Sequence, residues 1–513
     1  MSSGVRARQG AKDAMSMVSM MVGQCGNQIG AAAYSALHAE RPLAGDRALF
    51  DEGGHARAVL VDGEAKVVGA LVRHADGPFS RANAFAEDSG RGNNWALGYY
   101  GPRAGNHIVD RAMDALRRQL EASDAYRGGM IFHSLCGGTG AGLGSRIMEE
   151  MRDEALDLKS KRAHGLRHSK YARALTLRLS AKLAASPLVS TTVLPFSVGE
   201  LPLQHYNATL CLSRVLKEPA ACLLFSNNNL LSLCAKRNAA KPGSTSAVRP
   251  ADAAAATVKT KQINDYIGLA LASVLRPCVF SRHPKGRTAV PWDMAGSIAA
   301  LAPTPETKFL EIWAVQESSK RRIIGPPPWT SLGDRLAGEI PRYQHLAIGD
   351  GTSESTVRKI LAGGYQVFAR GATVTGGEGA EERQGALSAR AALSKSLDVN
   401  LSAQQLLHEP PKGPLHAGAT SENFANFTSS GAWICCPEQL TAAHPRALSV
   451  LTCRTGHLTH LELILERCER MAASGAYLHW YRKYGFEDQE LFLALEDLRV
   501  YLDDASDFFD SGA

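Results

Sequence analysis

The apolar residues of this chain form short runs and longer helical patterns, and polar or glycine-rich turns separate them. Short runs with the length and residue types of buried strands lie at 18–22, 58–61, 130–132 and 191–194. Helical patterns follow two of these runs, one reaching residue 39 and the other repeating apolar residues from 143 to 151. Strands that alternate with helices predict an α/β fold.

The second half of the chain continues this mixed pattern. It predicts a largely buried helix at 262–275, strands at 309–315 and 365–370, and helices at 458–471 and 487–502. Segments without clear periodicity separate these elements. They are a predicted disordered leader at 1–16, a basic insert at about 157–187, a flexible spacer at 239–256 and a polar stretch from 371 to about 426.

The segment 135–144 reads Leu-Cys-Gly-Gly-Thr-Gly-Ala-Gly-Leu-Gly and connects an apolar strand to a helix. Glycines let the backbone approach an anion, and a helix start offers unpaired N–H groups at the positive end of its dipole. The segment lacks the Lys-Ser/Thr of a P-loop and the G-x-G-x-x-G spacing of a dinucleotide fold. We interpret it as a phosphate cradle, with a tight strand-to-helix turn as the structural alternative.

Polar residues also follow two other predicted strands. A polar turn at 23–30 carries Gln24 and Asn27, whose amides can donate and accept hydrogen bonds to a nucleotide or cap a turn. Asp62 and Glu64 follow the strand at 58–61, where open α/β sheets bind ligands. These carboxylates could hold Mg²⁺ through water, or could be solvated loop residues.

Composition and charge narrow the class of protein. With 513 residues, 45% hydrophobic and 21% charged, the chain is predicted to fold as two or three globular domains. No apolar run reaches the roughly 18 residues that cross a bilayer, and no signal peptide is recognisable, which predicts the cytoplasm. The ten scattered cysteines are expected to be reduced.

The net charge of +7 arises in one segment. Eight Lys or Arg and no acidic residues lie between residues 159 and 182, so the rest of the chain carries about −1. This distribution argues against nucleic acid as a partner. The basic insert itself could be a surface helix, a disordered loop or an artefact of gene prediction.

Four segments resemble the motifs of the tubulin superfamily. The segment 136–142 is similar to its signature Gly-Gly-Gly-Thr-Gly-Ser-Gly, with Cys136 in the first place and Ala141 in the sixth. The segments 23–30, 57–64 and 92–96 resemble its Gly-Gln-Cys-Gly-Asn-Gln-Ile-Gly motif, its metal-side loop and its Gly-Asn-Asn-Trp-Ala loop. The resemblance covers about 18–510, with interruptions.

The resemblance implies GTP and Mg²⁺ as ligands. Gln24 would bind phosphate and metal, Cys25 would lie against the base, and Asp62 with Glu64 would lie near the metal. The other implied residues are Asn93 and Asn94 for the γ-phosphate, Gly137, Gly138, Thr139, Gly140 and Ala141 for the phosphates, Glu200 and Gln204 for the ribose, and Asn227 and Asn264 for guanine.

Some positions depart from the family pattern. Gln204 replaces a glutamate, and Thr260 lies near the place of the aromatic residue that stacks on the base. Gly296 stands where α-tubulin has the glutamate that acts on the GTP of a neighbouring subunit, and a glycine cannot position the attacking water. The resemblance therefore implies weak or absent GTPase activity.

The family architecture implies four parts. They are a Rossmann-like GTP-binding domain at 17–260, a central helix at 261–276, an intermediate α/β domain at 277–453 and a C-terminal helical hairpin region at 454–513. The basic-aromatic-glycine segment 482–488 is similar to the δ-tubulin family, and ζ-tubulin is a close relative. Residues 510–513 read Asp-Ser-Gly-Ala, where α- and β-tubulins have a long glutamate-rich tail.

The δ-like resemblance implies a cytoskeletal protein of centrioles and basal bodies of cilia that forms or stabilises triplet microtubules. Expected partners are other tubulins (α, β, ε or ζ), microtubule ends and centriolar proteins. A ζ-like basal-body protein and a stand-alone GTPase outside microtubules are the alternatives.

Overall fold

The computed structural model describes residues 15–39, 48–74, 76–102, 105–123, 125–161, 186–196, 201–239, 258–276, 294–317, 329–346, 356–370, 431–436 and 446–511. The chain forms two compact units. Unit 1 comprises Met1–Ser35, Pro42–Leu223 and Ile464–Val500, and unit 2 comprises Ala36–Arg41, Leu224–Leu463 and Tyr501–Ala513. Residues 1–14, 162–185, 240–257 and 371–430 lie outside the described residues, with most of the predicted leader, insert, spacer and polar stretch.

Unit 1 is built on five parallel strands. They are β1 (Met15–Val22), β2 (Ala58–Asp62), β3 (Ala84–Ala86), β4 (Ala125–Ser134) and β5 (Leu188–Leu194), in the order β5-β4-β1-β2-β3. The pairs Val22 with Val61 and Met21 with Phe132 place the carboxyl ends of β1, β2 and β4 at one edge. Val18 and Met20 to Val22 are fully buried, as expected for a parallel strand covered on both faces.

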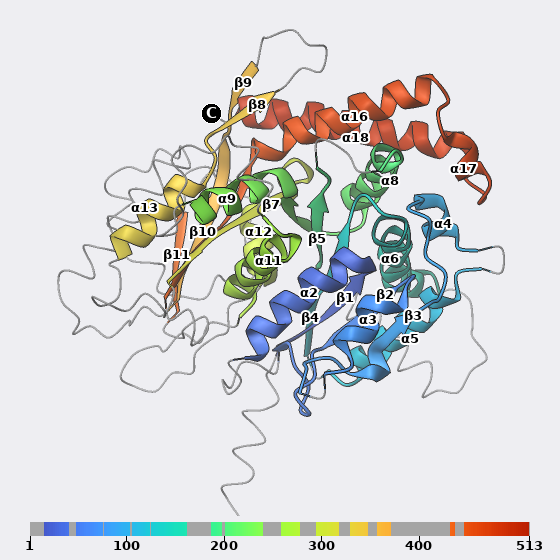
Figure 1. The fold of residues 1–513 in the computed structure, drawn as a ribbon, viewed down its shortest axis with the longest axis horizontal. Helices are drawn as coiled ribbons and strands as arrows, with labels where there is room; N and C mark the ends of the chain where they lie inside the picture. The colour runs from blue at the N-terminus through green and yellow to red at the C-terminus, as the bar shows by residue number, and fades with distance from the viewer. Residues whose placement is uncertain are drawn as a thin grey trace, which may run out of the picture. The chain divides into compact units, whose positions relative to one another are not determined.

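Helices flank these strands (Figure 1). Those of unit 1 are α2 (Gly23–His38, whose last residues belong to unit 2), α3 (Ala65–Leu71), α4 (Trp95–Tyr100), α5 (His107–Glu121), the π-helix η3 (Gly138–Leu143) with α6 (Gly144–Lys161), and α8 (Gln204–Lys217). In α5 the buried positions include Ile108, Ala112, Ala115 and Leu116, a spacing that follows the helical period.

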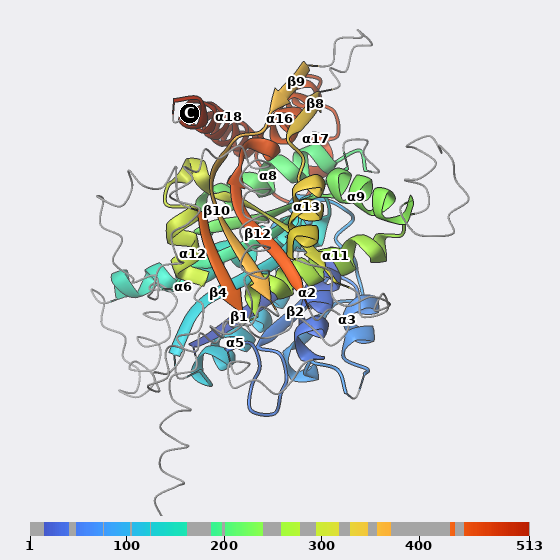
Figure 2. The ribbon, with the colours of Figure 1, turned by 90° about the vertical axis from the view of Figure 1, so that its left-hand side faces the viewer.

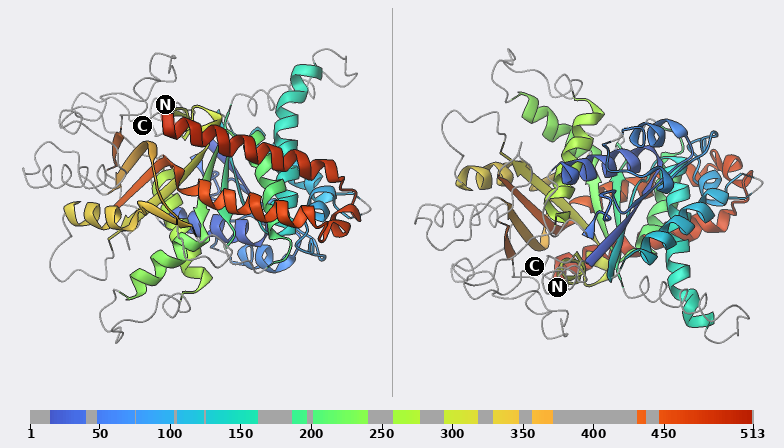
Figure 3. Two further views of the ribbon diagram at one scale, coloured as in Figure 1. Left: turned by 90° about the horizontal axis from the view of Figure 1, so that it is seen from above. Right: turned by 90° about the horizontal axis from the view of Figure 1, so that it is seen from below.

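A helical hairpin follows near the end of the chain. It consists of α16 (Leu458–Ala473), the short α17 (Leu478–Arg482) and α18 (Asp488–Ser511), and the two long helices lie side by side (Figure 3). Within unit 1, Arg499 on α18 donates to Glu469 on α16 at 2.8 Å. This pair is solvent-exposed, so it contributes little beyond the apolar contacts of Leu491, Leu495 and Leu498.

Unit 2 contributes four strands of a mixed sheet. They are β7 (Phe309–Gln316), β10 (Ala362–Arg370), β11 (Gly431–Cys436) and β12 (Ala447–Arg454), in the order β11-β10-β12-β7; only the β10–β11 pair is parallel. Of these strands, β10 and β12 lie side by side in Figure 2. The helices are α9 (Asn227–Ala239), α11 (Thr260–Leu275), α12 (Met294–Leu301) and α13 (Trp329–Glu339); β8 (Tyr343–Leu346) pairs with β9 (Thr356–Lys359). The strand β6 (Ala221–Ser226) spans the division between the units.

The main elements agree with the sequence predictions, with shifts at their ends. The helix predicted at 262–275 is α11, and the strands predicted at 309–315 and 365–370 are β7 and the later part of β10. The turn predicted at 23–30 is confined to Gly23, whose φ is 75°; the rest of that prediction was wrong because α2 follows β1 directly. The loop that the resemblance implies at 92–96 ends early, since Asn94 caps α4 and the helix begins at Trp95. No helix among the described residues is long and apolar enough to cross a membrane.

A buried histidine stabilises the core of unit 2. His457 is 3% exposed; its Nδ1 lies 2.8 Å from the Arg454 carbonyl, which can only accept, so Nδ1 carries the proton. Its Nε2 then accepts from the Tyr501 hydroxyl at 2.8 Å, and the ring packs on Phe309 at 4.9 Å between centroids. Burial lowers the pKa of His457 to about 4, so the neutral ring is the folded form.

We predict that acid weakens unit 2 through this residue. Because the folded pKa lies below the ordinary value of 6.5, the stabilisation is complete above pH 6.5 and is lost as pH falls toward about 4. His457→Gln should reduce the loss of unfolding free energy between pH 7.5 and 5 by about 2 kcal/mol, as measured by urea unfolding. The control is His107→Gln, since that side chain is 75% exposed. An unchanged pH dependence in His457→Gln would contradict the assignment.

Candidate functional site

The candidate site lies at the carboxyl edge of the unit 1 strands. α2 begins directly after β1, the loop Asp62 to Glu64 follows β2, and the segment 135–144 follows β4. Because neighbouring parallel strands end at the same edge, their following segments converge there. The sequence motifs at 23–30, 57–64 and 136–142 therefore meet in one place.

The glycine-rich segment forms the start of a helix. Gly137 precedes η3, the Ala141 N–H donates to the Gly137 carbonyl at 3.1 Å, and η3 continues into α6. The first N–H groups of a helix have no acceptor within the helix, and they lie at the positive end of its dipole. Gly138, Thr139 and Gly140 occupy these first positions. This arrangement suits an anion such as a phosphate.

Two other segments pack directly on this loop. A Cβ on Gly63 would lie 3.0 Å from Thr139 Oγ1, so the loop after β2 touches the side chain of Thr139. A Cβ on Gly23 would lie 2.8 Å from the Gly140 nitrogen, so the start of α2 lies against the same loop. Gln24 and Cys25 follow Gly23 on α2, and Gln24 is exposed.

The segment 91–98 approaches from a third side, and here glycine is required. A Cβ on Gly138 would lie 2.3 Å from the Arg91 carbonyl, and one on Gly98 would lie 2.0 Å from the Gly138 carbonyl. Any side chain at either position would push the two backbones apart. Asn93 adopts a left-handed φ of 49°, and Asn94 Oδ1 accepts from the Leu97 N–H at 3.2 Å as the N-cap of α4.

Asp62 and Glu64, the two carboxylates predicted to lie near the metal, differ in their surroundings. Asp62 is 4% exposed and accepts hydrogen bonds from the N–H groups of Gly63 and Glu64, yet burial raises its pKa to about 6. Glu64 is exposed, and its carboxylate lies over Gly90. A buried carboxylate with a raised pKa gains stability from a nearby cation, so this pair fits Mg²⁺.

A cation at this position would need ligands beyond the protein. Among the described residues, no group of three or more His, Cys, Asp or Glu is arranged to hold a metal ion. Mg²⁺ commonly takes one or two carboxylates and completes its octahedron with phosphate oxygens and water. Asp62 and Glu64 fit that pattern better than a metal site built from protein alone.

The predicted base and sugar residues lie in several elements. Cys25 is half-buried, and burial raises its pKa to about 12, so it is a neutral thiol that can lie against a base. Gln204 begins α8, and its side-chain amide lies 3.4 Å from the Phe196 carbonyl. Glu200 lies outside the described residues. Asn227 and Asn264 belong to unit 2, at the start of α9 and within α11, and both are half-buried.

Two buried side chains that the sequence analysis did not select support the loops. Arg91 is 3% exposed; it forms an ion pair with Glu87 at 2.5 Å and donates to Asn106 Oδ1 at 3.0 Å. Asn207 is fully buried beneath the loops. Its motif, Tyr-Asn-Ala-Thr-Leu, was visible in the sequence, but nothing in the sequence indicated which partners its side chain would contact.

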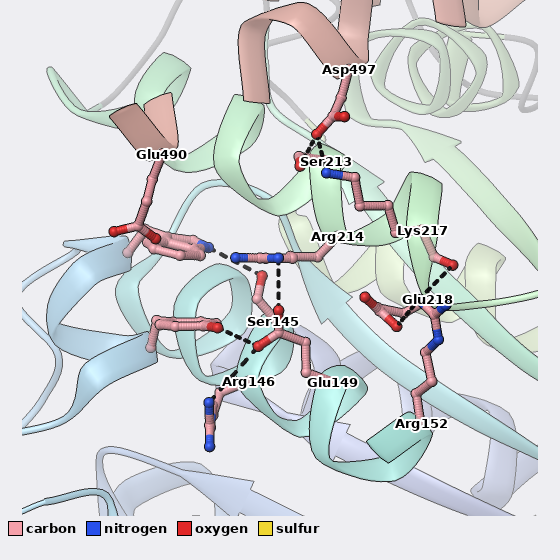
Figure 4. Close-up of polar contacts among 12 residues, drawn as sticks. Ser145, Arg146, Glu149, Arg152, Ser213, Arg214, Lys217, Glu218, Glu490 and Asp497 are labelled. Carbon is pink, nitrogen blue, oxygen red and sulfur yellow. Dashed lines mark hydrogen bonds and ion pairs between the residues drawn. The ribbon is translucent and has the colours of Figure 1, made fainter. Parts of the chain in front are cut away.

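A polar cluster joins the helices behind the loops (Figure 4). Glu149 on α6 accepts from the Tyr99 hydroxyl and pairs with Arg214 on α8 at 2.7 Å. Asp497 on α18 accepts from Ser213 and pairs with Lys217, each at 2.5 Å. Trp95 Nε1 donates to Ser145 at 3.1 Å. All four helices are therefore fixed relative to the loop that begins α4.

Comparison with known proteins agrees with this geometry. Residues 16–159 match the model of the Tubulin/FtsZ family, GTPase domain. The fold and this match thus define the class of protein, one that carries a GTPase domain of the Tubulin/FtsZ family at residues 16–159.

Similar proteins that match nearly the whole chain indicate which kind of tubulin it resembles. The chain is 26% identical to a tubulin delta chain of Macaca fascicularis and 25% identical to one of Homo sapiens, in each case over 94% of this chain and 98% of the relative. It is 30% identical to a tubulin beta-1 chain of Colletotrichum graminicola over 42% of this chain and 47% of the relative. Over nearly its whole length the chain is therefore similar to tubulin delta chains, and residues 16–159 match the GTPase domain of the Tubulin/FtsZ family.

We predict that Asp62 lowers the stability of the protein when no metal is bound. Its folded pKa of about 6 exceeds the ordinary 3.8, so protonated Asp62 favours the folded state. This contribution to the free energy of unfolding is complete below pH 3.8 and is lost as pH rises through 6. In EDTA at pH 7.5, Asp62→Asn should therefore stabilise the protein by about 1–2 kcal/mol, with a smaller gain at pH 4.5. Thermal unfolding measures both values.

The matched control is Glu64→Gln, which removes a charge from the same loop at an exposed position. It should change the unfolding free energy by less than about 0.5 kcal/mol. A destabilised Asp62→Asn protein at pH 7.5 would show that this carboxylate has a stabilising partner instead.

Proposed function

We propose that this protein binds GTP with Mg²⁺ at the carboxyl edge of the unit 1 strands. The observation that carries this proposal is the convergence of three segments, each from a separate tubulin-like motif, on the loop Gly137 to Ala141. A tight turn alone would explain the glycines within the loop. It would not explain why the segments after β1 and β2 and the segment before α4 all pack against it.

The phosphates would be held mainly by backbone N–H groups of Gly138, Thr139 and Gly140. Among the described residues, Asn93 Oδ1 at 3.8 Å is the one atom within 4 Å of a Cβ built on Gly137, so they leave space on this side of the loop. We place the phosphate chain there, with Asn93 and Asn94 next to its end. Asp62, Glu64 and Gln24 would hold the Mg²⁺, which neutralises phosphate charge when bound.

The assignments for the nucleoside rest on the family resemblance. Cys25 would contact the base, Glu200 and Gln204 the ribose, and Asn227 and Asn264 the guanine edge. An asparagine can pair with guanine O6 or with its N1 and N2 donors, which adenine does not offer. We therefore expect GTP to be preferred over ATP.

GTP hydrolysis is proposed to be weak or absent. Gly296 lies in α12 and has no side chain to position a water molecule. The protein would then use bound GTP as a structural ligand, as a subunit that contacts other tubulins (α, β, ε or ζ) or microtubule ends. A stand-alone GTPase would instead show turnover in the absence of any tubulin.

The similarity to delta chains supports a role in centrioles and basal bodies, where the protein would form or stabilise triplet microtubules. A ζ-tubulin-like basal-body function is the alternative. A tagged copy should localise to basal bodies of ciliated cells, and depletion should leave incomplete triplets in electron micrographs of basal-body cross-sections. Normal triplets and a diffuse signal would oppose this role.

We predict that Gly137→Ala weakens GTP binding without weakening the fold. The φ of Gly137 is −91°, which any residue adopts, and its Cβ would enter open space, so the unfolding midpoint should stay unchanged. The methyl group would occupy the proposed phosphate position, and titration with fluorescent GTP should show at least about a tenfold loss of affinity.

The control variant is Gly338→Ala. Gly338 is an exposed helical glycine, and no atom of the described part of the chain lies within 4 Å of an added Cβ, so both stability and GTP affinity should be retained. ATP in excess should not displace the labelled GTP from the wild-type protein. Failure of the wild-type protein to bind GTP, together with an empty nucleotide extract, would refute the proposed function.

A further inference from the structure

One buried amide connects the two glycine-containing loops of the site. Asn207 Nδ2 donates to the Asn93 carbonyl at 2.8 Å and to the Cys136 carbonyl at 2.6 Å. Its Oδ1 accepts from the Trp95 N–H at 2.9 Å. The side chain is fully buried, so water cannot replace these partners. Asn207 therefore fixes the distance between the segment before α4 and the segment before η3.

The same oxygen has a second donor from the C-terminal part of unit 1. The Tyr481 hydroxyl donates to Asn207 Oδ1 at 2.6 Å, and Tyr481 is fully buried. Next to it, Asn94 Nδ2 donates to the Trp480 carbonyl at 3.1 Å. The helix α17 thus contacts Asn207 and Asn94, whose side chains both bond to the segment around the proposed γ-phosphate loop.

α17 has an inner and an outer side. Leu478 and Tyr481 are buried, whereas the Trp480 side chain is 48% exposed and Tyr477, which precedes the helix, is 44% exposed. Tyr477 also adopts a left-handed φ of 61° that turns the chain into α17. A change in the position of α17 would therefore be transmitted inward through hydrogen bonds to both loops.

We propose that Asn207 is a positioning residue for the phosphate loops and that the Tyr481 hydroxyl couples their geometry to α17. This inference rests on the proposed GTP site and adds a regulatory element to it. Coupling between two sites is reciprocal. If the docked position of α17 raises GTP affinity by some factor, bound GTP favours that docked position of α17 by the same factor.

The chain provides a closely matched pair of tyrosines to test this. Tyr206 is 1% exposed, its ring packs on Tyr481 at 5.5 Å between centroids, and its hydroxyl donates to the Ala476 carbonyl at 2.9 Å. Tyr481→Phe and Tyr206→Phe each remove one buried hydroxyl next to the same C-terminal segment. Only the Tyr481 hydroxyl is bonded to Asn207.

We expect Tyr481→Phe to weaken binding of fluorescent GTP by about 5- to 10-fold, while Tyr206→Phe leaves the affinity within about twofold of wild type. Both variants should lower the unfolding midpoint by similar amounts, so stability alone cannot produce the difference. Equal GTP affinities for the two variants would overturn the inference.

Hydrogen exchange provides a second readout that a purely structural tyrosine would not alter. In the wild-type protein and in Tyr206→Phe, GTP should slow amide exchange across residues 477–486. In Tyr481→Phe this protection should shrink, and protection that is equal in all three proteins would count against coupling.

Asn207→Asp tests the positioning role. The variant keeps an oxygen for the Trp95 N–H and the Tyr481 hydroxyl, but it turns the second oxygen toward the carbonyls of Asn93 and Cys136. It should bind GTP more weakly than Tyr481→Phe, and GTP affinity equal to wild type would refute the role. If this variant does not fold, the GTP affinities of Tyr481→Phe and Tyr206→Phe still test whether α17 is coupled to the loops. A wild-type protein that does not bind GTP would refute the proposed function instead.

Discussion

The contact on which the site depends is the backbone-to-backbone approach between the segment before α4 and the segment 137–142. Gly138 lies under the Arg91 carbonyl, Gly98 lies under the Gly138 carbonyl, and a Cβ on Gly142 would lie 2.1 Å from the Trp95 carbonyl. Side chains would separate these backbones by more than an ångström. The first N–H groups of η3 remain available for an anion because the loops pack through glycine backbone and not through capping side chains.

The polar groups beneath these loops explain how such a contact is held. Two closely packed loops carry many carbonyl groups, and buried carbonyls require donors. Asn207 supplies two donors, and Arg91 is buried with Glu87 and Asn106. Behind them, Glu149 and Arg214 join α6 to α8, and Asp497 joins α8 to α18. The glycine-rich loops are thus held in place by hydrogen bonds and ion pairs from the surrounding helices.

Asp62, unlike these polar groups, lowers the stability of the metal-free protein while it serves the proposed metal site. A buried carboxylate whose pKa is raised to about 6 destabilises the metal-free protein at neutral pH. The proposed Mg²⁺ would remove this penalty, so ligand binding and folding would stabilise each other. The same reasoning applies to α17, whose buried Tyr481 makes part of the loop geometry depend on a segment far away in the sequence.

Much of the fold and of the candidate site was predictable from local patterns. Short apolar runs predicted β1, β2, β4 and β5, because strands buried on both faces need continuous apolar residues. The motifs at 23–30, 57–64 and 136–142 follow predicted strands, so they also predicted the segments that meet at the sheet edge, since parallel strands end on the same side. The turn predicted at 23–30 reduces to Gly23, whose left-handed φ of 75° lets α2 follow β1 directly.

The hydrogen-bond partners of individual side chains required the tertiary structure. Asn207 lies 114 residues from Asn93 and 274 from Tyr481, and no periodicity in the sequence indicates which of many carbonyls and hydroxyls it contacts. The unequal environments of Asp62 and Glu64 likewise depend on what covers each carboxylate. The sequence specified which chemical groups reach the sheet edge, and only the packing of distant segments determined their burial, their pKa values and their partners, because those properties depend on neighbours in space.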